Sequence, residues 1–284
     1  MDAEAHERLS SAERGGLVLV GCCADMVINY PVWILAKRWS AGLGSPKGFG
    51  EYYKGATSLL FSYGPMMLVE DHTTGLMVRS LDGVTGSQTA AHFAAACFSG
   101  AVGAVTIGAQ IEGVITRAHA TGETVFEAAK SMVAARGIAS IAAPYGALAM
   151  AGREIPFAGA VFCLSGLIRA QLRAAWPTAA ESSGSSDGSG GASVLRDLFG
   201  ASIAACVAGP LSQPPSVVAA HQQAHQVSIG AACRKIYTRG GYRGFFSGLV
   251  PRTASIAGTT FVMTFVVESL QPIVERYHEE NSSS

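Results

Sequence analysis

Charged residues are scarce in this chain of 284 residues. Only 14% of them are Asp, Glu, Lys or Arg, 49% are hydrophobic, and the mean hydropathy is +0.31. Soluble domains carry about 25% charged residues, so this deficit favours a membrane protein over a large soluble helical protein, which is the alternative. The remaining charges cancel to a net charge of zero at pH 7, which gives no argument for a nucleic-acid partner.

Motifs that carry catalysis or bind cofactors are also missing. The six cysteines form no C-x-x-C pair and lie mostly in apolar stretches, which predicts apolar filler residues rather than disulfides or metal ligands. No phosphate loop, nucleotide motif or Ser/His/Asp arrangement is present. We therefore expect no catalytic residue, no metal, no cofactor and no enzyme activity. The N-terminal stretch has no apolar h-region, so any organelle address is expected inside the chain.

What the chain does contain is long apolar segments, each about as long as the roughly 20 residues that a membrane-spanning helix needs. They lie at residues 15–38, 56–80, 91–119, 144–172, 196–222 and 247–274. Glycine is abundant, with 34 residues, and small-x-x-x-small pairs such as Ala96/Gly100 and Gly200/Ala204 suit close helix packing in lipid. Six spanning helices with both termini on one side are the simplest topology.

Two short stretches between apolar segments read as amphipathic helices. Residues 124–136 end at Gly137, and Phe126, Met132 and Val133 are expected toward one face. Residues 227–239 have the same character and end at Gly240. The corresponding span 41–52 holds four glycines and a proline, so it is not expected to form a comparable helix.

The apolar segments repeat in pairs. The ends of the odd segments share a polar pattern, which runs Pro31 to Arg38, Gln110 to Arg117 and Pro214 to Gln223. Each even segment opens with a glycine and continues to a proline or glycine, in the order Gly55 and Pro65, Gly146 and Pro156, and Gly248, Pro251 and Gly258. The division predicted is a tail at 1–14, repeats at 15–80, 91–172 and 194–274, a flexible Gly/Ser linker at 177–193, and a tail at 275–284.

This layout resembles the mitochondrial carrier family over nearly the whole chain. The best matches are Arg153-Glu-Ile-Pro-Phe157 and the run from Tyr242 to Pro251, both typical of the family's even helices. The resemblance implies an all-α, multi-pass protein of the mitochondrial inner membrane, with six helices in a pseudo-threefold barrel and short helices on the matrix side. It also implies lipid partners, cardiolipin among them, and helix kinks at Pro31, Pro65, Pro156 and Pro214.

The sequence departs from the family at the residues that form interhelical salt bridges. The acidic positions read Trp33, Glu112 and Ser216, and the basic positions that should pair with them read Ala36, Ile115 and Ala219. Glu112 therefore has no motif partner. The remnants of the two gates are Glu112, Arg117, Arg169, Glu268 and Gln271.

These losses favour a degenerate carrier that no longer transports. Alternating access needs two closed states, each held by interactions that the other lacks, whereas apolar replacements favour one packing. We expect a structural membrane subunit of a larger assembly, with a respiratory-chain complex as a host and protein partners around it. An outer-membrane scaffold of the same fold stays open.

The alternative is an antiporter for an amino acid or a similar small charged metabolite. The family's substrate-contact positions correspond to Ser62, Arg153 with Glu154, and Ser255. A charged pair at mid-membrane depth is by default a functional-site hypothesis. Against this, Arg153 and Glu154 could serve only to hold the bundle by pairing with Glu112 or Arg117.

Histidines and tryptophans near segment ends supply the last candidates. His221 and His225 are four residues apart on one helix face, which would be half of a metal site, but a solvated helix end is the favoured interpretation. Trp33 and Trp39 flank the end of the first segment and read as interfacial anchors or contacts to a neighbour.

Overall fold

The computed structural model describes residues 11–81, 84, 86–175 and 190–282, and this part of the chain contains helices and turns but no strand. The predicted linker 177–193 and the first ten residues lie largely or wholly outside these ranges. The longer α-helices are α2 (Ser11–Ile28), α3 (Tyr30–Ser40), α5 (Ala56–Leu81), α6 (Gln88–Gly103), α7 (Ala109–Thr121), α10 (Ala147–Ala158), α11 (Ser165–Ala175), α13 (Gly190–His225) and α15 (Leu249–Ser282). The shorter segments are α4 (Phe49–Tyr52), η1 (Ala104–Gly108), α8 (Val125–Arg136), α9 (Ala139–Ala142), η2 (Gly159–Leu164), α14 (Ile229–Gly240) and η3 (Gly241–Phe246).

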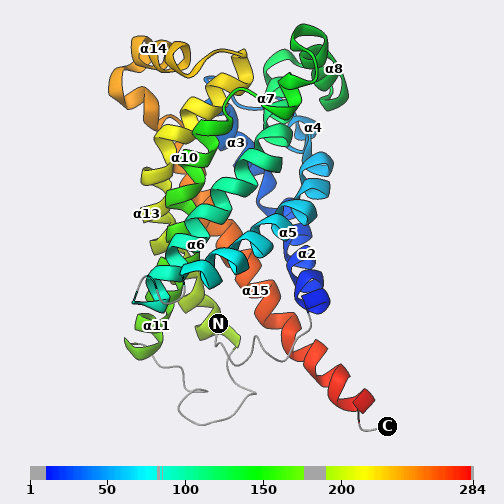
Figure 1. Ribbon diagram of the computed structural model, residues 1–284, viewed down its shortest axis with the longest axis vertical. Coiled ribbons are helices and arrows are strands. Elements are labelled where there is room, and N and C mark those ends of the chain that lie inside the picture. Colours follow the sequence, from blue (N-terminus) through cyan, green and yellow to red (C-terminus); the bar gives the residue numbers. More distant parts are fainter. Residues whose placement is uncertain (1–10, 82–83, 85, 176–189, 283–284) are drawn as a thin grey trace.

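The long helices contact one another in a closed ring. Helix α2 contacts α5, and the contacts continue through α6, α10, α13 and α15, which returns to α2. Figure 1 shows these tilted helices around a common axis, with α8 and α14 at one end and the start of α2 and the end of α15 at the other. The ring confirms the all-α architecture that the sequence predicts.

Three to five candidate membrane spans are found among the described residues, against the six that the sequence predicts. In the described residues three helices are long and apolar enough to cross a membrane: Gln88–Thr121, Leu198–His225 and Ile229–Val266. Two bent pairs would raise the number to five: Gly15–Ile28 with Tyr30–Ser40, at 65°, and Val125–Arg136 with Ala139–Ala158, at 113°. Helix α5 does not qualify, since Glu70, Asp71 and Arg79 interrupt its apolar run.

Three glycines that precede α5, α10 and α15 mark a cyclic pattern of close packing. Gly55, Gly146 and Gly248 have φ angles of +89°, +94° and +78°, a conformation that a side chain disfavours. A Cβ atom at Gly55 would lie 2.9 Å from Ile115, and one at Gly146 would lie 3.0 Å from the Ala219 carbonyl oxygen. One at Gly248 would lie 2.8 Å from the Ala36 carbonyl oxygen. Each glycine thus packs against one of the three residues that occupy the basic positions of the predicted motif, Ile115, Ala219 and Ala36.

The predicted kink at Pro31 is a helix break. The chain leaves α2 at Ile28, passes Asn29 and turns into α3 with Pro31 in its first turn. Because proline has no N–H, the carbonyl of Val27 loses its helical donor. The Tyr53 hydroxyl replaces that donor and lies 2.8 Å from the Val27 oxygen. The other predicted kink residues lie inside helices that continue past them: Pro65, Pro156 and Pro214.

The short helices form largely where the sequence predicts them. Thr124 caps α8 in a capping box with Glu127, and α8 ends before Gly137. Helix α14 continues to Gly240, one residue beyond the predicted end, and α4 has only four residues. The predicted face of α8 is wrong in part, because Met132 is buried but Phe126 is 72% exposed.

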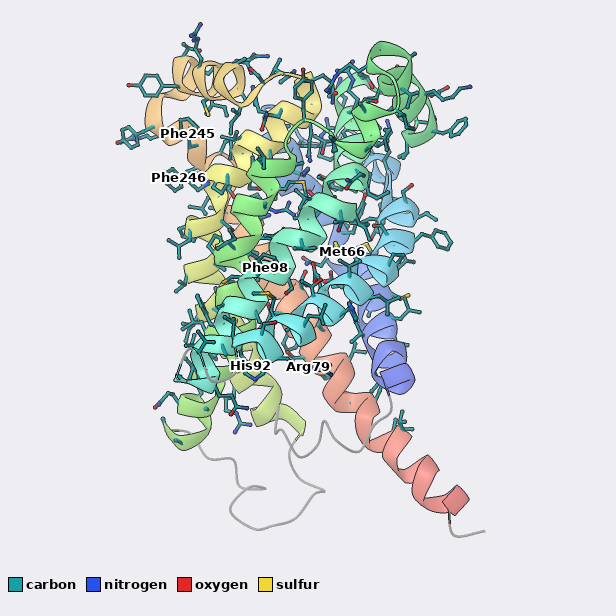
Figure 2. All side chains as sticks on the ribbon, viewed as in Figure 1. Met66, Arg79, His92, Phe98, Phe245 and Phe246 are labelled. Carbon is teal, nitrogen blue, oxygen red and sulfur yellow. The ribbon has the colours of Figure 1, made fainter. Side chains whose placement is uncertain are left out.

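Large apolar side chains on the outside of the ring mark the surface that faces lipid. Phe98, Leu148 and Val250 are all exposed, and Phe98 and Phe246 are labelled in Figure 2. An apolar outer face of this extent suits a bilayer, because a soluble monomer rarely exposes so much. The chain is therefore a multi-pass membrane protein.

Candidate functional site

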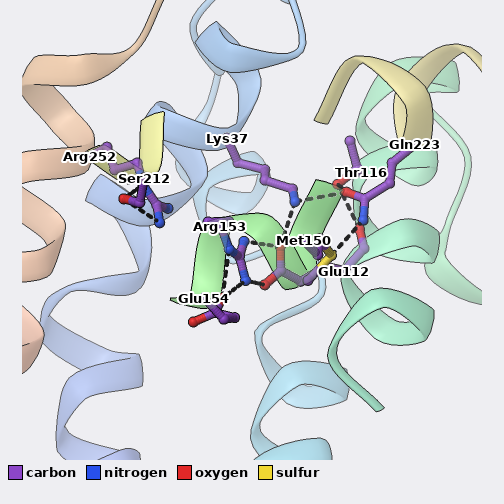
Figure 3. A network of polar contacts seen from close by, with 9 residues as sticks. All are labelled: Lys37, Glu112, Thr116, Met150, Arg153, Glu154, Ser212, Gln223 and Arg252. Carbon is purple, nitrogen blue, oxygen red and sulfur yellow. Dashed lines mark hydrogen bonds and ion pairs between the residues drawn. The ribbon is translucent and has the colours of Figure 1, made fainter. Parts of the chain in front are cut away.

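A buried carboxylate, that of Glu112 on α7, joins three helices inside the ring (Figure 3). Its Oε2 lies 2.5 Å from Lys37 Nζ on α3. Arg153 on α10 makes a two-pronged pair with it, with Nη1 2.9 Å from Oε2 and Nη2 2.8 Å from Oε1. Exposed fractions of 6% for Lys37, 7% for Glu112 and 6% for Arg153 show that water reaches none of them freely. We call Lys37, Glu112 and Arg153 the central ion cluster.

Polar neighbours complete the hydrogen bonding of this cluster. Gln223 on α13 accepts from Lys37 Nζ at 2.8 Å and from the Thr116 hydroxyl at 3.2 Å. The Gln223 amide nitrogen faces the Met150 sulfur at 2.9 Å. Gln223 therefore links a fourth helix, α13, to the central ion cluster.

Glu154 adds a second carboxylate next to the cluster. It forms an ion pair with Arg153, and Arg153 Nε donates to Glu154 Oε1 at 2.6 Å. Arg153 thus directs its donors toward two carboxylates of the protein itself. The two-pronged pair of Arg153 with Glu112 is the stronger of these contacts, since bidentate, charge-assisted pairs are among the strongest hydrogen-bonded contacts in proteins.

The partner of Glu112 is the main correction to the sequence analysis. The three motif positions for a basic residue do read Ala36, Ile115 and Ala219. Glu112 is nevertheless not without a cation, because Lys37 and Arg153 both pair with it. The motif does not identify Lys37, because this lysine lies one residue after Ala36, the position that the motif assigns to the basic residue. A lysine within an apolar helix was the signal that could have identified it.

The predicted substrate-contact residues do not form one group. Arg153 and Glu154 belong to or adjoin the central ion cluster, whereas the Ser62 hydroxyl only donates to the Leu59 carbonyl of its own helix at 2.7 Å. Ser255 lies on α15, where Asn29 Nδ2 donates to its carbonyl at 2.8 Å. Arg153 pairs with Glu112, as expected if Arg153 serves to hold the bundle together and not to bind a substrate.

A small cavity lies beside the cluster, between α3, α13 and α15. Lys37 and Arg252 supply its charges, Ser40, Ser216 and Ser255 its hydroxyls, and Trp33 part of its wall. The cavity has a volume of about 10 Å³. Two of the lining residues, Trp33 and Ser216, occupy positions at which the predicted motif expects acidic residues.

The other gate remnants take no visible part in the cluster. Arg117 Nη1 donates to the Ala224 carbonyl on α13 at 3.0 Å. The side chains of Arg169, Glu268 and Gln271 lie outside the described part of the structure.

A surface ion pair ties α3 to α4 at the end of the bundle. Arg38 Nη1 lies 3.7 Å from Glu51 Oε2, and the Lys47 backbone N–H donates to the same oxygen at 3.0 Å. The Lys47 amide stabilises the charged form and holds the pKa of Glu51 below its usual value.

The histidine pair differs from its predicted setting. His221 is 3% exposed, so it does not lie at a solvated helix end. Its ring stands edge-on to that of His225 with centroids 4.6 Å apart. No group of three or more His, Cys, Asp or Glu that could hold a metal occurs among the described residues.

Comparison with known proteins adds one finding to this geometry. The family model described as mitochondrial carrier protein matches residues 190–278. This range includes α13, α14, η3 and most of α15. The comparison with curated proteins gave no significant match.

Proposed function

Because residues 190–278 form a mitochondrial carrier domain, we propose that the whole chain is a carrier-like barrel of the mitochondrial inner membrane. Its three repeats would be 15–80, 91–172 and 194–274, with two spans each. The cyclic contacts of Gly55, Gly146 and Gly248 support this division, since each relates an even helix to the odd helix of another repeat.

We further propose that the barrel is held in one closed state and acts as a structural subunit of a larger membrane assembly, with a respiratory-chain complex as host. The observation that carries this proposal is that Glu112 binds both Lys37 and Arg153 inside the ring. Opening the barrel there would separate Glu112 from its two cations, so the central ion cluster favours the closed state. Arg153 is also occupied by protein carboxylates and is not free for a solute.

Native electrophoresis of mitochondria solubilised in mild detergent tests the structural role. We expect the 29.3 kDa chain to migrate in a larger band together with other proteins. Migration alone, at its own mass plus detergent, would remove this proposal. Identification of the co-migrating proteins would name the host.

A second candidate function is antiport of an amino acid or a similar small charged metabolite, and the polar groups that line the cavity favour it. Lys37, Arg252 and the hydroxyls of Ser216 and Ser255 converge there, and an open state of the barrel would have to widen this space of about 10 Å³ to admit the solute. Such a set of groups would suit a small polar solute with a negative charge.

Exchange in liposomes distinguishes the two functions. If the chain transports, purified protein should exchange a labelled amino acid or carboxylate, and Arg153→Ala should abolish exchange. Arg234→Gln, an exposed site on α14, is the control that should leave exchange intact. No exchange by the folded wild-type protein across such a panel would eliminate the antiporter.

A further inference from the structure

Arg252 is a buried cation without a carboxylate partner among the described residues. Its exposed fraction is 9%, and its contacts are with the Ser212 hydroxyl, which lies 3.4 Å from both Nε and Nη2. Two such contacts, at the long end of hydrogen-bond distances, leave a guanidinium poorly compensated. An isolated charge in an apolar surrounding is costly, so a counter-ion is expected nearby.

The neighbouring charges do not supply that counter-ion. The carboxylate of Glu112 is shared by Lys37 and Arg153, and Glu154 is paired with Arg153. The three cations Lys37, Arg153 and Arg252 therefore outnumber the two carboxylates of Glu112 and Glu154 by one positive charge. The excess lies on the side of Arg252, which Figure 3 shows apart from the central ion cluster.

The cavity between Arg252 and Lys37 has the chemistry for one small anion. Its volume of about 10 Å³ is at the lower end of the roughly 10–15 Å³ that a single water molecule needs, so a metabolite does not fit, and a monatomic anion fits once the lining side chains move slightly outward. Both cations and the hydroxyls of Ser40, Ser216 and Ser255 line it. Hydroxyls and a guanidinium can all donate hydrogen bonds to an anion, and the positive charges exclude a metal cation.

We propose that this cavity binds one small inorganic monovalent anion, chloride in the cell, as a counter-ion between Lys37 and Arg252. The anion balances the excess charge and ties α3 to the neighbouring helix α15. Such a site would exist whether or not the barrel moves a solute, so it stands independently of the two functions proposed above.

Thermal unfolding in detergent tests the site with chloride itself as the probe. A ligand that binds the folded state raises Tm as its concentration increases. In sodium chloride we expect a higher Tm than in sodium gluconate of equal ionic strength, with saturation of the effect. Arg252→Gln should remove this dependence, while the exposed Arg234→Gln should keep it. Equal Tm values for the wild-type protein in the two salts would overturn the proposal.

The chloride NMR line provides a second readout that needs no unfolding. Chloride in exchange with a protein site gives a broadened line, and excess broadening should occur with wild type and Arg234→Gln but not with Arg252→Gln. Equal broadening with all three would mean surface binding and contradict the site. If Arg252→Gln does not fold, Arg252→Lys keeps the charge and should retain a weaker broadening. A competition experiment with formate distinguishes chloride from a small carboxylate as the bound anion. If formate removes the excess broadening of the chloride line at a concentration similar to that of chloride, the site prefers a carboxylate and the chloride assignment is wrong.

Discussion

The carboxylate of Glu112 uses both of its oxygens to hold cations that come from two other helices. Lys37 lies on α3 and Arg153 on α10, and both side chains are buried from water. Desolvation makes each of these charges costly alone, so their stability depends on the carboxylate between them.

Replacement of this carboxylate should be strongly destabilising. Glu112→Gln keeps the size of the side chain but leaves Lys37 and Arg153 buried without their shared anion. We expect a loss of about 3–5 kcal/mol of unfolding free energy, measured by chemical or thermal unfolding in detergent.

The same substitution at Glu51 is the matched control. Glu51 contacts Arg38 and the Lys47 amide at an exposed position, so Glu51→Gln should have a much smaller effect. A loss from Glu112→Gln no larger than that from Glu51→Gln would contradict the role of the central ion cluster.

Single residues also show where reasoning from the sequence stops. Arg153, Glu154 and Glu112 are recognisable as unusual charges in apolar segments, and their pairing is one of the alternatives that the sequence leaves open. Lys37 is not, because the motif register points to Ala36. A helical turn allows a long lysine side chain to reach from a neighbouring position, which a motif read position by position does not detect.

The helices themselves are joined through close contacts at their first turns. Gly55, Gly146 and Gly248 each place a left-handed residue just before a long helix and against a different odd helix. The spacing of these glycines is visible in the sequence, but their contacts with Ile115, Ala219 and Ala36 require the three-dimensional ring.

Substitution of the middle glycine should disturb its helix junction. In Gly146→Ala, the φ of +94° would cost about 1–2 kcal/mol for an L-residue, and the new Cβ would press on the Ala219 carbonyl. We expect a lower Tm than wild type. Gly230→Ala on α14 meets no atom within 4 Å and should leave Tm unchanged or slightly higher. Similar Tm values for both variants would argue against the tight junction.

Other elements separate local from long-range information. The length of α8, its end before Gly137 and the absence of a comparable helix at 41–52 follow from local residues and are correctly predicted. The exposure of Phe126 and the burial of His221 depend on which helices approach them, and the predictions for both are wrong. The π-helical segments η1 and η2 also have no signal in the patterns that we used.

The molecule as a whole depends on ring closure. Helix α15 lies between α2 and α13, and Gln223 brings α13 to the central ion cluster. A chain of residues 1–175 lacks both helices and therefore cannot complete the ring.

We expect residues 1–175 expressed alone to be rapidly degraded by protease in membranes, and co-expression with residues 190–284 to restore resistance. Limited proteolysis followed by immunoblotting measures both. Fragment 190–284 with Gln223→Leu is a control that should restore resistance less well. Full resistance of residues 1–175 alone would show that the first two repeats are self-sufficient.

The sharing of one carboxylate by two cations also restricts how the sequence can change over time. Loss of Glu112 strands two charges at once, whereas joint replacement of all three ionic residues by apolar ones of similar volume can be nearly neutral. Loss of Lys37 alone leaves Glu112 paired with Arg153, so only a lineage that loses Glu112 first must pass through a poorly stable intermediate. Chains that lack Glu112 should accordingly also lack Lys37.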